Sequence, residues 1–211
     1  MTTEALVLWQ NPGWGSAIVE VQAAFYGLPV RLSEAGDLFD DAAARQRLAA
    51  LNPLCQIPTV QLPDGTVMTE SAAITLYLAD LTGSEALVPG PMAPERAAFL
   101  RWLIFLVAAI YPTFIFGDMP ERYVAADQGP ALQARMIEER QRLWRVVEAA
   151  ASDGPWFLGT RFSALDLYIS CMVHWRPRRD WFAAECPKLS RIAATTAALP
   201  QVAVVMDRNF G

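Results

Sequence analysis

Residues 52–74, NPLCQIPTVQLPDGTVMTESAAI, carry the clearest structural pattern in this chain. Residues 57–62 alternate between two faces, as a β-strand does. Residues 63–65, Pro-Asp-Gly, are typical of a tight turn, and residues 66–69 return as a second strand. Residues 71–81 then have a helical pattern. The stretch therefore predicts a β-hairpin followed directly by a helix.

The residues before this stretch alternate between strand-like and helical patterns. Residues 5–9 form an apolar run of strand length, and residues 30–34 form a second, weaker strand. Residues 16–26 place apolar side chains at helical spacing, and residues 41–51 are rich in Ala and Arg and predict another helix. The predicted order is β-α-β-α-β-β-α over residues 1–82, which is an α/β domain with a mixed sheet.

The composition changes after residue 82. Residues 83–93 form a linker in a Pro-rich stretch with little charge, which is typical of a domain boundary. Residues 94–211 lack strand-like alternation and predict an all-helical domain. Its expected helices span residues 95–116 with a kink before Pro112, residues 130–151, residues 165–173 and, as the last, residues 187–199.

The composition argues against several classes of protein. Of 211 residues, 54% are apolar and 18% are charged, which is enough for a core and excludes disorder. The net charge of −5, with no basic stretch, argues against a nucleic-acid partner. With His174 and Lys188 as the single histidine and lysine, we expect no metal site, no Ser-His-Asp triad and no P-loop.

The cysteines and the apolar run indicate the compartment. The chain has three widely spaced cysteines, Cys55, Cys171 and Cys186. An odd number without a C-x-x-C motif indicates free thiols in a reducing cytoplasm. The N-terminal residues show no signal-peptide pattern. The uncharged run 102–117 has 16 residues, whereas a bilayer needs about 20, so it predicts a buried core helix. We expect a cytoplasmic protein with no membrane partner.

Ile57-Pro58 is the first feature that points to a site. Proline inside a paired strand removes a hydrogen bond from the ladder, so Pro58 belongs at a sheet edge or after a cis peptide bond. A cis bond would leave the amide and carbonyl of Ile57 free to bind an extended, peptide-like ligand. Taken alone, the pattern favours the ordinary edge-strand proline.

Two further features lie at predicted helix starts. Ser71 is suited to cap a helix, whose open amides could bind a carboxylate while Glu70 holds an ammonium group. Such a pair would fit an α-amino acid head group, although simple capping with a solvated glutamate is favoured when the pair is taken alone. Ser163 and Asp166 have the spacing of a capping box, with Asp in place of Glu.

Taken together and in order, these features resemble the cytosolic glutathione S-transferases. The segments that carry the resemblance are Asn52 to Val60, Leu62 to Gly65, Thr69 to Ile74, Tyr77-Leu78 and the capping box at residues 163–166. The resemblance covers nearly the whole chain, and the pattern is closest to bacterial, beta-like members without their catalytic cysteine. It implies a thioredoxin-like domain, a C-terminal helical bundle and a homodimer.

The resemblance also implies an activity and a glutathione site. The activity is conjugation of the glutathione thiolate to an electrophilic carbon of a small apolar substrate, with glutathione as co-substrate and no metal. Pro58 would be cis, and the backbone of Ile57 would pair with the cysteinyl unit of glutathione. Glu70 and Ser71 would hold its γ-glutamyl end, with Gln56 nearby.

The residue that activates the thiol departs from the family pattern. The family uses Tyr, Ser or Cys in the turn after the first strand, to hydrogen-bond the thiolate and lower the thiol pKa. Aligned on Pro12-Gly13, the position that is Cys in the beta class is Gly15. Ser16 and Asn11 remain as catalytic candidates. Capping by Ser16 and turn formation by Asn11 are the structural alternatives.

The second substrate is expected to bind between the two domains. The residues proposed to line its pocket are Trp14, Tyr111 and Phe114, although aromatic side chains at helical spacing are also typical of a core. A non-catalytic glutathione-binding or interaction module is the main alternative function. A glutathione-dependent isomerase, lyase or dehalogenase would use the same thiolate. A role in detoxification and a role in one catabolic route both stay open.

Overall fold

In the computed structural model, which describes residues 5–211, the chain forms two compact units. The first contains the residues up to Val88 together with Thr195–Gly211, and the second contains Pro89–Ala194. The domain boundaries inferred from the sequence, 1–82 and 94–211 with a linker at 83–93, stay a prediction.

A four-stranded sheet in the order β2-β1-β3-β4 lies at the centre of the first unit. β1 pairs in parallel with β2 and antiparallel with β3, so the sheet is mixed, as predicted. The strands are β1 (Leu6–Gln10), β2 (Val30–Glu34), β3 (Thr59–Gln61) and β4 (Val67–Met68). The helices of this unit include α1 (Ser16–Tyr26), α2 (Ala42–Ala49) and α3 (Ser71–Thr82). The thioredoxin-like order βαβαββα is confirmed.

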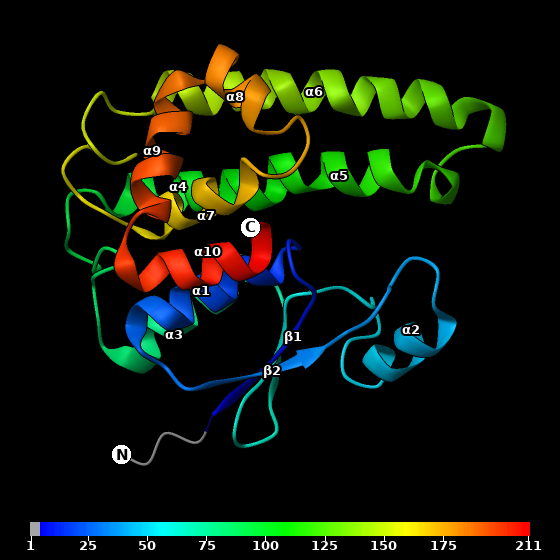
Figure 1. Ribbon diagram of the computed structural model, residues 1–211, viewed down its shortest axis with the longest axis horizontal. Helices are drawn as coiled ribbons and strands as arrows, with labels where there is room; N and C mark the ends of the chain where they lie inside the picture. Colours follow the sequence, from blue (N-terminus) through cyan, green and yellow to red (C-terminus); the bar gives the residue numbers. More distant parts are fainter. Residues whose placement is uncertain (1–4) are drawn as a thin grey trace. The chain divides into compact units, whose positions relative to one another are not determined.

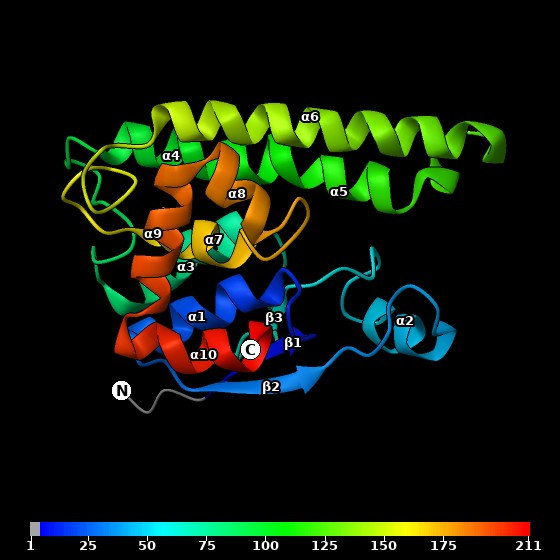
Figure 2. The same cartoon turned by 45° about the horizontal axis from the view of Figure 1, so that its top comes forward.

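Two apolar clusters hold these helices to the sheet. Leu8 and Val60 of the strands pack with Val19 of α1 and with Ile74 and Leu78 of α3, so α1 and α3 cover one face. The neighbour of Leu8 along β1, Trp9, points to the opposite face because side chains alternate along a strand. It packs with Ala44 and Leu48 of α2 in the second cluster. Both views show α2 apart from α1 and α3 (Figures 1 and 2).

Helix α10 (Pro200–Phe210) belongs to the first unit and lies along α1 (Figures 1 and 2). The sequence analysis was wrong to end the helices at residue 199. Pro200 occupies the first turn of a further helix, where its missing N–H is no loss. The buried residues Val202, Val205 and Met206 have the helical spacing that could have revealed α10.

The second unit is helical, as predicted. Its helices are α4 (Arg96–Phe105), α5 (Tyr111–Asp118), α6 (Gly129–Ala150), α7 (Ala164–Met172), α8 (Arg179–Glu185) and α9 (Pro187–Ala197). The last of these, α9, extends past the unit boundary. The sequence analysis did not predict α8. A π-helical segment, Leu106–Ile110, joins α4 to α5 and ends two residues before Pro112. It lies where the sequence predicts a kink, because proline cannot complete the hydrogen bonds of a regular α-helix.

Among residues 5–211, the helical stretch Arg96–Asp118 is long and apolar enough to cross a membrane, with a mean hydropathy of 1.9. α9 and α10 pass the same test only if this sharply bent pair counts as one broken span. This test uses length and composition alone, and core helices of soluble proteins also pass it. Within the second unit, α6 packs along α5, but only 33% of the most apolar window is buried, and Ile104 and Phe116 are exposed. The predicted core helix is therefore buried in part.

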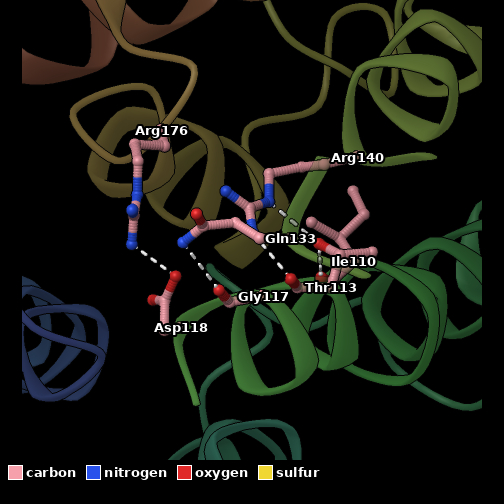
Figure 3. Close-up of polar contacts among 7 residues, drawn as sticks. All are labelled: Ile110, Thr113, Gly117, Asp118, Gln133, Arg140 and Arg176. Atoms are coloured by element: carbon pink, nitrogen blue, oxygen red, sulfur yellow. Dashed lines mark hydrogen bonds and ion pairs between the residues drawn. The ribbon is translucent and has the colours of Figure 1, made fainter. Parts of the chain in front are cut away.

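Arg140 of α6 is buried against α5 (Figure 3). Its Nε donates to the hydroxyl of Thr113 at 2.9 Å, and its Nη2 donates to the carbonyl of Thr113 at 2.7 Å. The guanidinium carbon lies 3.7 Å from the centre of the Phe114 ring. Burial lowers the pKa of Arg140 to about 10, which keeps it charged at neutral pH. Gln133 and the Arg176–Asp118 ion pair make further contacts with the end of α5.

Replacing Arg140 with Met is expected to lower the free energy of unfolding by about 2 kcal/mol, measured by urea denaturation. In the variant, the hydroxyl and carbonyl oxygens of Thr113 lose the hydrogen bonds from Arg140, which lowers stability. Removal of the buried charge offsets part of this loss. Arg135→Met on the same helix is the matched control, since the Arg135 side chain is 78% exposed. It should change stability by less than about 0.5 kcal/mol. Equal effects of the two substitutions would contradict this account of Arg140.

Candidate functional site

The candidate site of the first unit lies where the turn 11–16 meets the Ile57-Pro58 peptide bond, which is cis as predicted. A Cβ atom added to Gly15 would lie 3.3 Å from the carbonyl oxygen of Ile57 and 3.6 Å from Cδ of Pro58. The two backbone segments are therefore in close contact at Gly15. Glycine allows this approach, because a larger side chain would displace the loop that carries Pro58.

The backbone of Ile57 lies outside the sheet. β3 begins at Thr59, and neither the amide nor the carbonyl of Ile57 has a hydrogen-bond partner within residues 5–211. The preceding carbonyl, of Gln56, accepts from Asn52 Nδ2 at 2.9 Å and from the Thr59 hydroxyl at 2.8 Å. Asn52 and Thr59 are buried and fix this loop, while Gln56 is exposed. The sequence analysis did not identify Asn52 and Thr59 as positioning residues.

The start of α3 presents polar groups that have no hydrogen-bond partner among residues 5–211. Glu70 has a φ of 63°, in the left-handed region that non-glycine residues rarely adopt, and it is exposed. Glu70 stands at the cap position and Ser71 is the first helical residue, so the expectation that Ser71 caps the helix was wrong. The Ser71 side chain is buried, and its hydroxyl has no hydrogen-bond partner within the described part of the chain.

The first backbone amides of α3, which belong to Ser71 and the two residues after it, also have no acceptor among residues 5–211. Within residues 5–211, the amides of Ser71, Ala72 and Ala73 donate to no acceptor, and Ile74 donates to the carbonyl of Glu70 at 3.0 Å. Free N–H groups and the positive end of the helix dipole favour an anion at this position. The start of α3 is therefore suited to bind a carboxylate, with the Glu70 carboxylate next to it in the chain to accept from an ammonium group.

Ser16 and Asn11 are both engaged inside the fold. Ser16 is fully buried, and its hydroxyl accepts from the Asn11 amide at 3.3 Å and donates to the Asn11 carbonyl at 3.2 Å. The Asn11 side chain donates to the Gly36 carbonyl at 2.7 Å and accepts from the Gly36 amide at 3.2 Å. The two side chains therefore hold the turn in shape.

Two backbone amides at the start of α1 have no acceptor among residues 5–211, although Ser16 is fully buried. Ala17 donates to the carbonyl of Trp14 at 3.0 Å, and Ile18 donates to that of Gly15 at 3.3 Å. Within the described residues, the amides of Gly15 and Ser16 donate to no acceptor. As at α3, these amides and the helix dipole favour negative charge, so a thiolate placed here would be stabilised.

The aromatic residues expected to line a second pocket have partners within their own units. In the first unit, the ring of Trp14 packs on that of Phe39 with the centroids 4.9 Å apart. In the second unit, Tyr111 and Phe114 both pack on Trp175, with centroids 5.9 and 5.7 Å away. The grouping of Trp14 with Tyr111 and Phe114 stays a prediction. Across residues 5–211, no three His, Cys, Asp or Glu side chains form a group that could hold a metal ion.

Comparison with known proteins identifies relatives of this chain. A family model described as the N-terminal domain of glutathione S-transferases matches residues 17–81. The uncharacterised GST-like protein YncG of Escherichia coli K12 is 36% identical over 198 residues, which cover 94% of this chain and 95% of that protein. Glutathione S-transferase GstA of Escherichia coli O157:H7 is 31% identical over 129 residues, 60% of each chain.

A solved structure has the same fold. It is the crystal structure of a glutathione transferase homologue from Sulfitobacter with bound glutathione, and it matches with a TM-score of 0.82. The match covers 96% of this chain and 97% of that one at 23% sequence identity. At this identity the similarity shows the fold alone.

Proposed function

This chain belongs to the glutathione S-transferase family, and on that premise we propose that it joins the thiolate of glutathione to an electrophilic carbon of a small apolar substrate. The observation that carries the proposal is the start of α3. A buried hydroxyl and open amides that have no partner within the described part of the chain occur there together with a strained Glu70. These groups match the carboxylate and ammonium of the γ-glutamyl end. No metal is needed for this reaction.

The remaining contacts follow the order of the tripeptide. The amide and carbonyl of Ile57 pair with the cysteinyl unit, as one strand pairs with another. Pro58 fixes the direction of that backbone, and Gln56 contacts the ligand from the exposed side. This arrangement is supported by the free backbone groups of Ile57 and by the contact between its loop and Gly15.

The start of α1 activates the thiol in this proposal. The amides of Gly15 and Ser16 stabilise the thiolate, whose proton passes to solvent. The sulfur then forms a bond to the electrophilic carbon as the leaving group departs with the bonding electrons. Ser16 and Asn11 act by holding the turn that aims these amides.

Titration calorimetry of the wild-type protein with reduced glutathione tests the proposal. We expect a dissociation constant between about 1 μM and 1 mM, the range in which enzymes usually bind their substrates. Oxidation of the titrant should be excluded by a thiol assay of the solution. Absence of binding at several times the upper limit would contradict a glutathione-dependent function.

Replacing Ser16 or Asn11 with Ala is expected to lower kcat by about tenfold, measured with a chromogenic aryl halide at saturating glutathione. Either variant releases hydrogen bonds that shape the turn, so the amides are less well aimed, whereas the γ-glutamyl site at α3 is untouched. The dissociation constant for glutathione should therefore change by less than about threefold. Unchanged turnover in both variants would remove these residues from the proposed mechanism.

A non-catalytic glutathione-binding module is the second candidate. It is favoured by the internal hydrogen bonds of Ser16 and Asn11, which leave the turn without a free side-chain donor of the family's usual kinds. Glutathione binding without turnover of any electrophile in a broad panel would support this candidate. A cytoplasmic homodimer and a pocket lined by Trp14, Tyr111 and Phe114 complete the proposal for an active transferase.

A further inference from the structure

The turn that carries the proposed thiolate site is tied to helix α10. The amide of Gly13 donates to Oδ1 of Asn209 at 3.1 Å, across a separation of 196 residues. Gly13 has a φ of 77°, and a Cβ atom there would lie 3.2 Å from the Asn209 carbonyl. The turn therefore needs glycine at this position for two reasons, its backbone conformation and its close approach to α10.

The orientation of the Asn209 side chain is set from its other end. Asn209 is buried, and its Nδ2 donates to Oε2 of Glu20 at 3.1 Å and to the carbonyl of Val205 at 2.9 Å. Glu20, on α1, is 4% exposed and forms an ion pair with Arg208 of α10. A carboxylate only accepts hydrogen bonds, so it directs the amide nitrogen of Asn209 towards itself and the amide oxygen towards Gly13.

We infer that Asn209 is a positioning residue for the thiolate site, oriented by Glu20 and Arg208. Through Gly13 it fixes the turn 11–16, and with it the amides of Gly15 and Ser16 at the start of α1. The inference deepens the proposed function and rests on it. Helix α10 thus acts on the thiol of glutathione through one hydrogen-bond relay, Glu20–Asn209–Gly13, without touching the ligand.

The alternative is that these bonds only dock α10 onto α1. The two roles differ in what they predict for bound glutathione. Loss of a docking bond lowers stability and leaves the thiol unaffected, whereas loss of a positioning bond raises the pKa of the bound thiol. That pKa can be read from the ultraviolet absorbance of the thiolate as a function of pH.

The test compares Asn209→Ala with Asp207→Asn, a control at an exposed position of the same helix. For Asn209→Ala we expect the pKa of bound glutathione to rise by about one unit and kcat/KM at neutral pH to fall about tenfold. The dissociation constant for glutathione should change by less than about threefold, because α3 is untouched. Amide hydrogen exchange at Gly13 should also become faster. The control should leave all four quantities unchanged.

Substitutions at both Asn209 and Glu20 provide a second test that distinguishes the positioning role from the docking role. Asn209→Asp alone places a carboxylate against that of Glu20 and should raise the thiol pKa at least as much as Asn209→Ala. Adding Glu20→Gln reverses the polarity of the relay while an oxygen at position 209 still accepts from Gly13. The double variant should therefore recover part of the wild-type thiol pKa, because Asp at position 209 no longer donates to the Val205 carbonyl and Gln at position 20 no longer pairs with Arg208.

The outcomes distinguish this inference from the function on which it rests. No glutathione binding by the wild-type protein would overturn the proposed function and, with it, the role of Asn209. Binding by the wild type with an unchanged thiol pKa in a folded Asn209→Ala protein would overturn the positioning role alone. So would a double variant that regains thermal stability but not the thiol pKa.

Discussion

Replacing Glu70 with Gln is expected to weaken glutathione binding by about 30- to 100-fold, measured by titration calorimetry at neutral pH. The substitution keeps the length of the side chain but removes the charge proposed to hold the ammonium group. A charge-assisted hydrogen bond contributes about 2–3 kcal/mol, which corresponds to this loss. Asp80→Asn at the other end of α3 is the matched control, since Asp80 is exposed. It should leave the affinity unchanged.

Ser71→Ala adds a sharper check of the same site. Its hydroxyl is buried without a partner within the described residues, so removing it should leave the free protein as stable as before or slightly more stable. Glutathione binding should nevertheless weaken by about tenfold, because the ligand loses a donor. Unchanged stability together with weaker glutathione binding is expected of a residue whose role is in binding. A residue whose role is in folding would lose stability instead. Loss of stability without loss of affinity would contradict the proposed γ-glutamyl site.

Replacing Asp166 with Ala is expected to lower the free energy of unfolding by about 3–5 kcal/mol, measured by urea denaturation. The predicted capping box is confirmed, with Ser163 donating its amide to Asp166 Oδ2 at 2.8 Å. Oδ1 of Asp166 also accepts from the Phe157 amide at 2.7 Å, so the carboxyl group joins the loop before α7 to the helix. The substitution leaves buried donors of Ser163 and Phe157 without acceptors.

The pH dependence of this effect has a definite sign. Burial raises the pKa of Asp166 from 3.8 to about 6, although its hydrogen bonds act in the opposite direction. Between these values the folded protein binds this proton more tightly than the unfolded chain does. The contribution of the shifted pKa is therefore fully present below pH 3.8, declines as pH rises through about 6, and is lost above that. The difference in unfolding free energy between wild type and Asp166→Ala should follow that trend. A difference that grows with pH would contradict it.

Local features account for what the sequence predicted correctly. The strand and helix order of the first unit and the capping box at Ser163 follow from periodicity, turn chemistry or a motif of a few residues. The cis bond before Pro58 was implied by the resemblance to the family, since the local pattern alone favoured an edge-strand proline. The resemblance to glutathione S-transferases rests on the same short segments. Such patterns act over one or two turns of chain, so they can be recognised without knowing how the chain packs.

The sequence alone was therefore enough to identify the family, the order of the elements up to residue 82 and, through the family resemblance, the residues proposed to bind glutathione, whereas α8 and α10 were missed. Only the tertiary structure decided what the polar residues of the turn do, because hydrogen-bond partners distant in the chain depend on packing. The sequence of Ser16 and Asn11 is the same whether they contact the thiolate or shape the turn. Their hydrogen bonds within the turn and to Gly36 show that they shape the turn. The contact between Gly13 and Asn209 joins residues 196 positions apart, which no local pattern encodes.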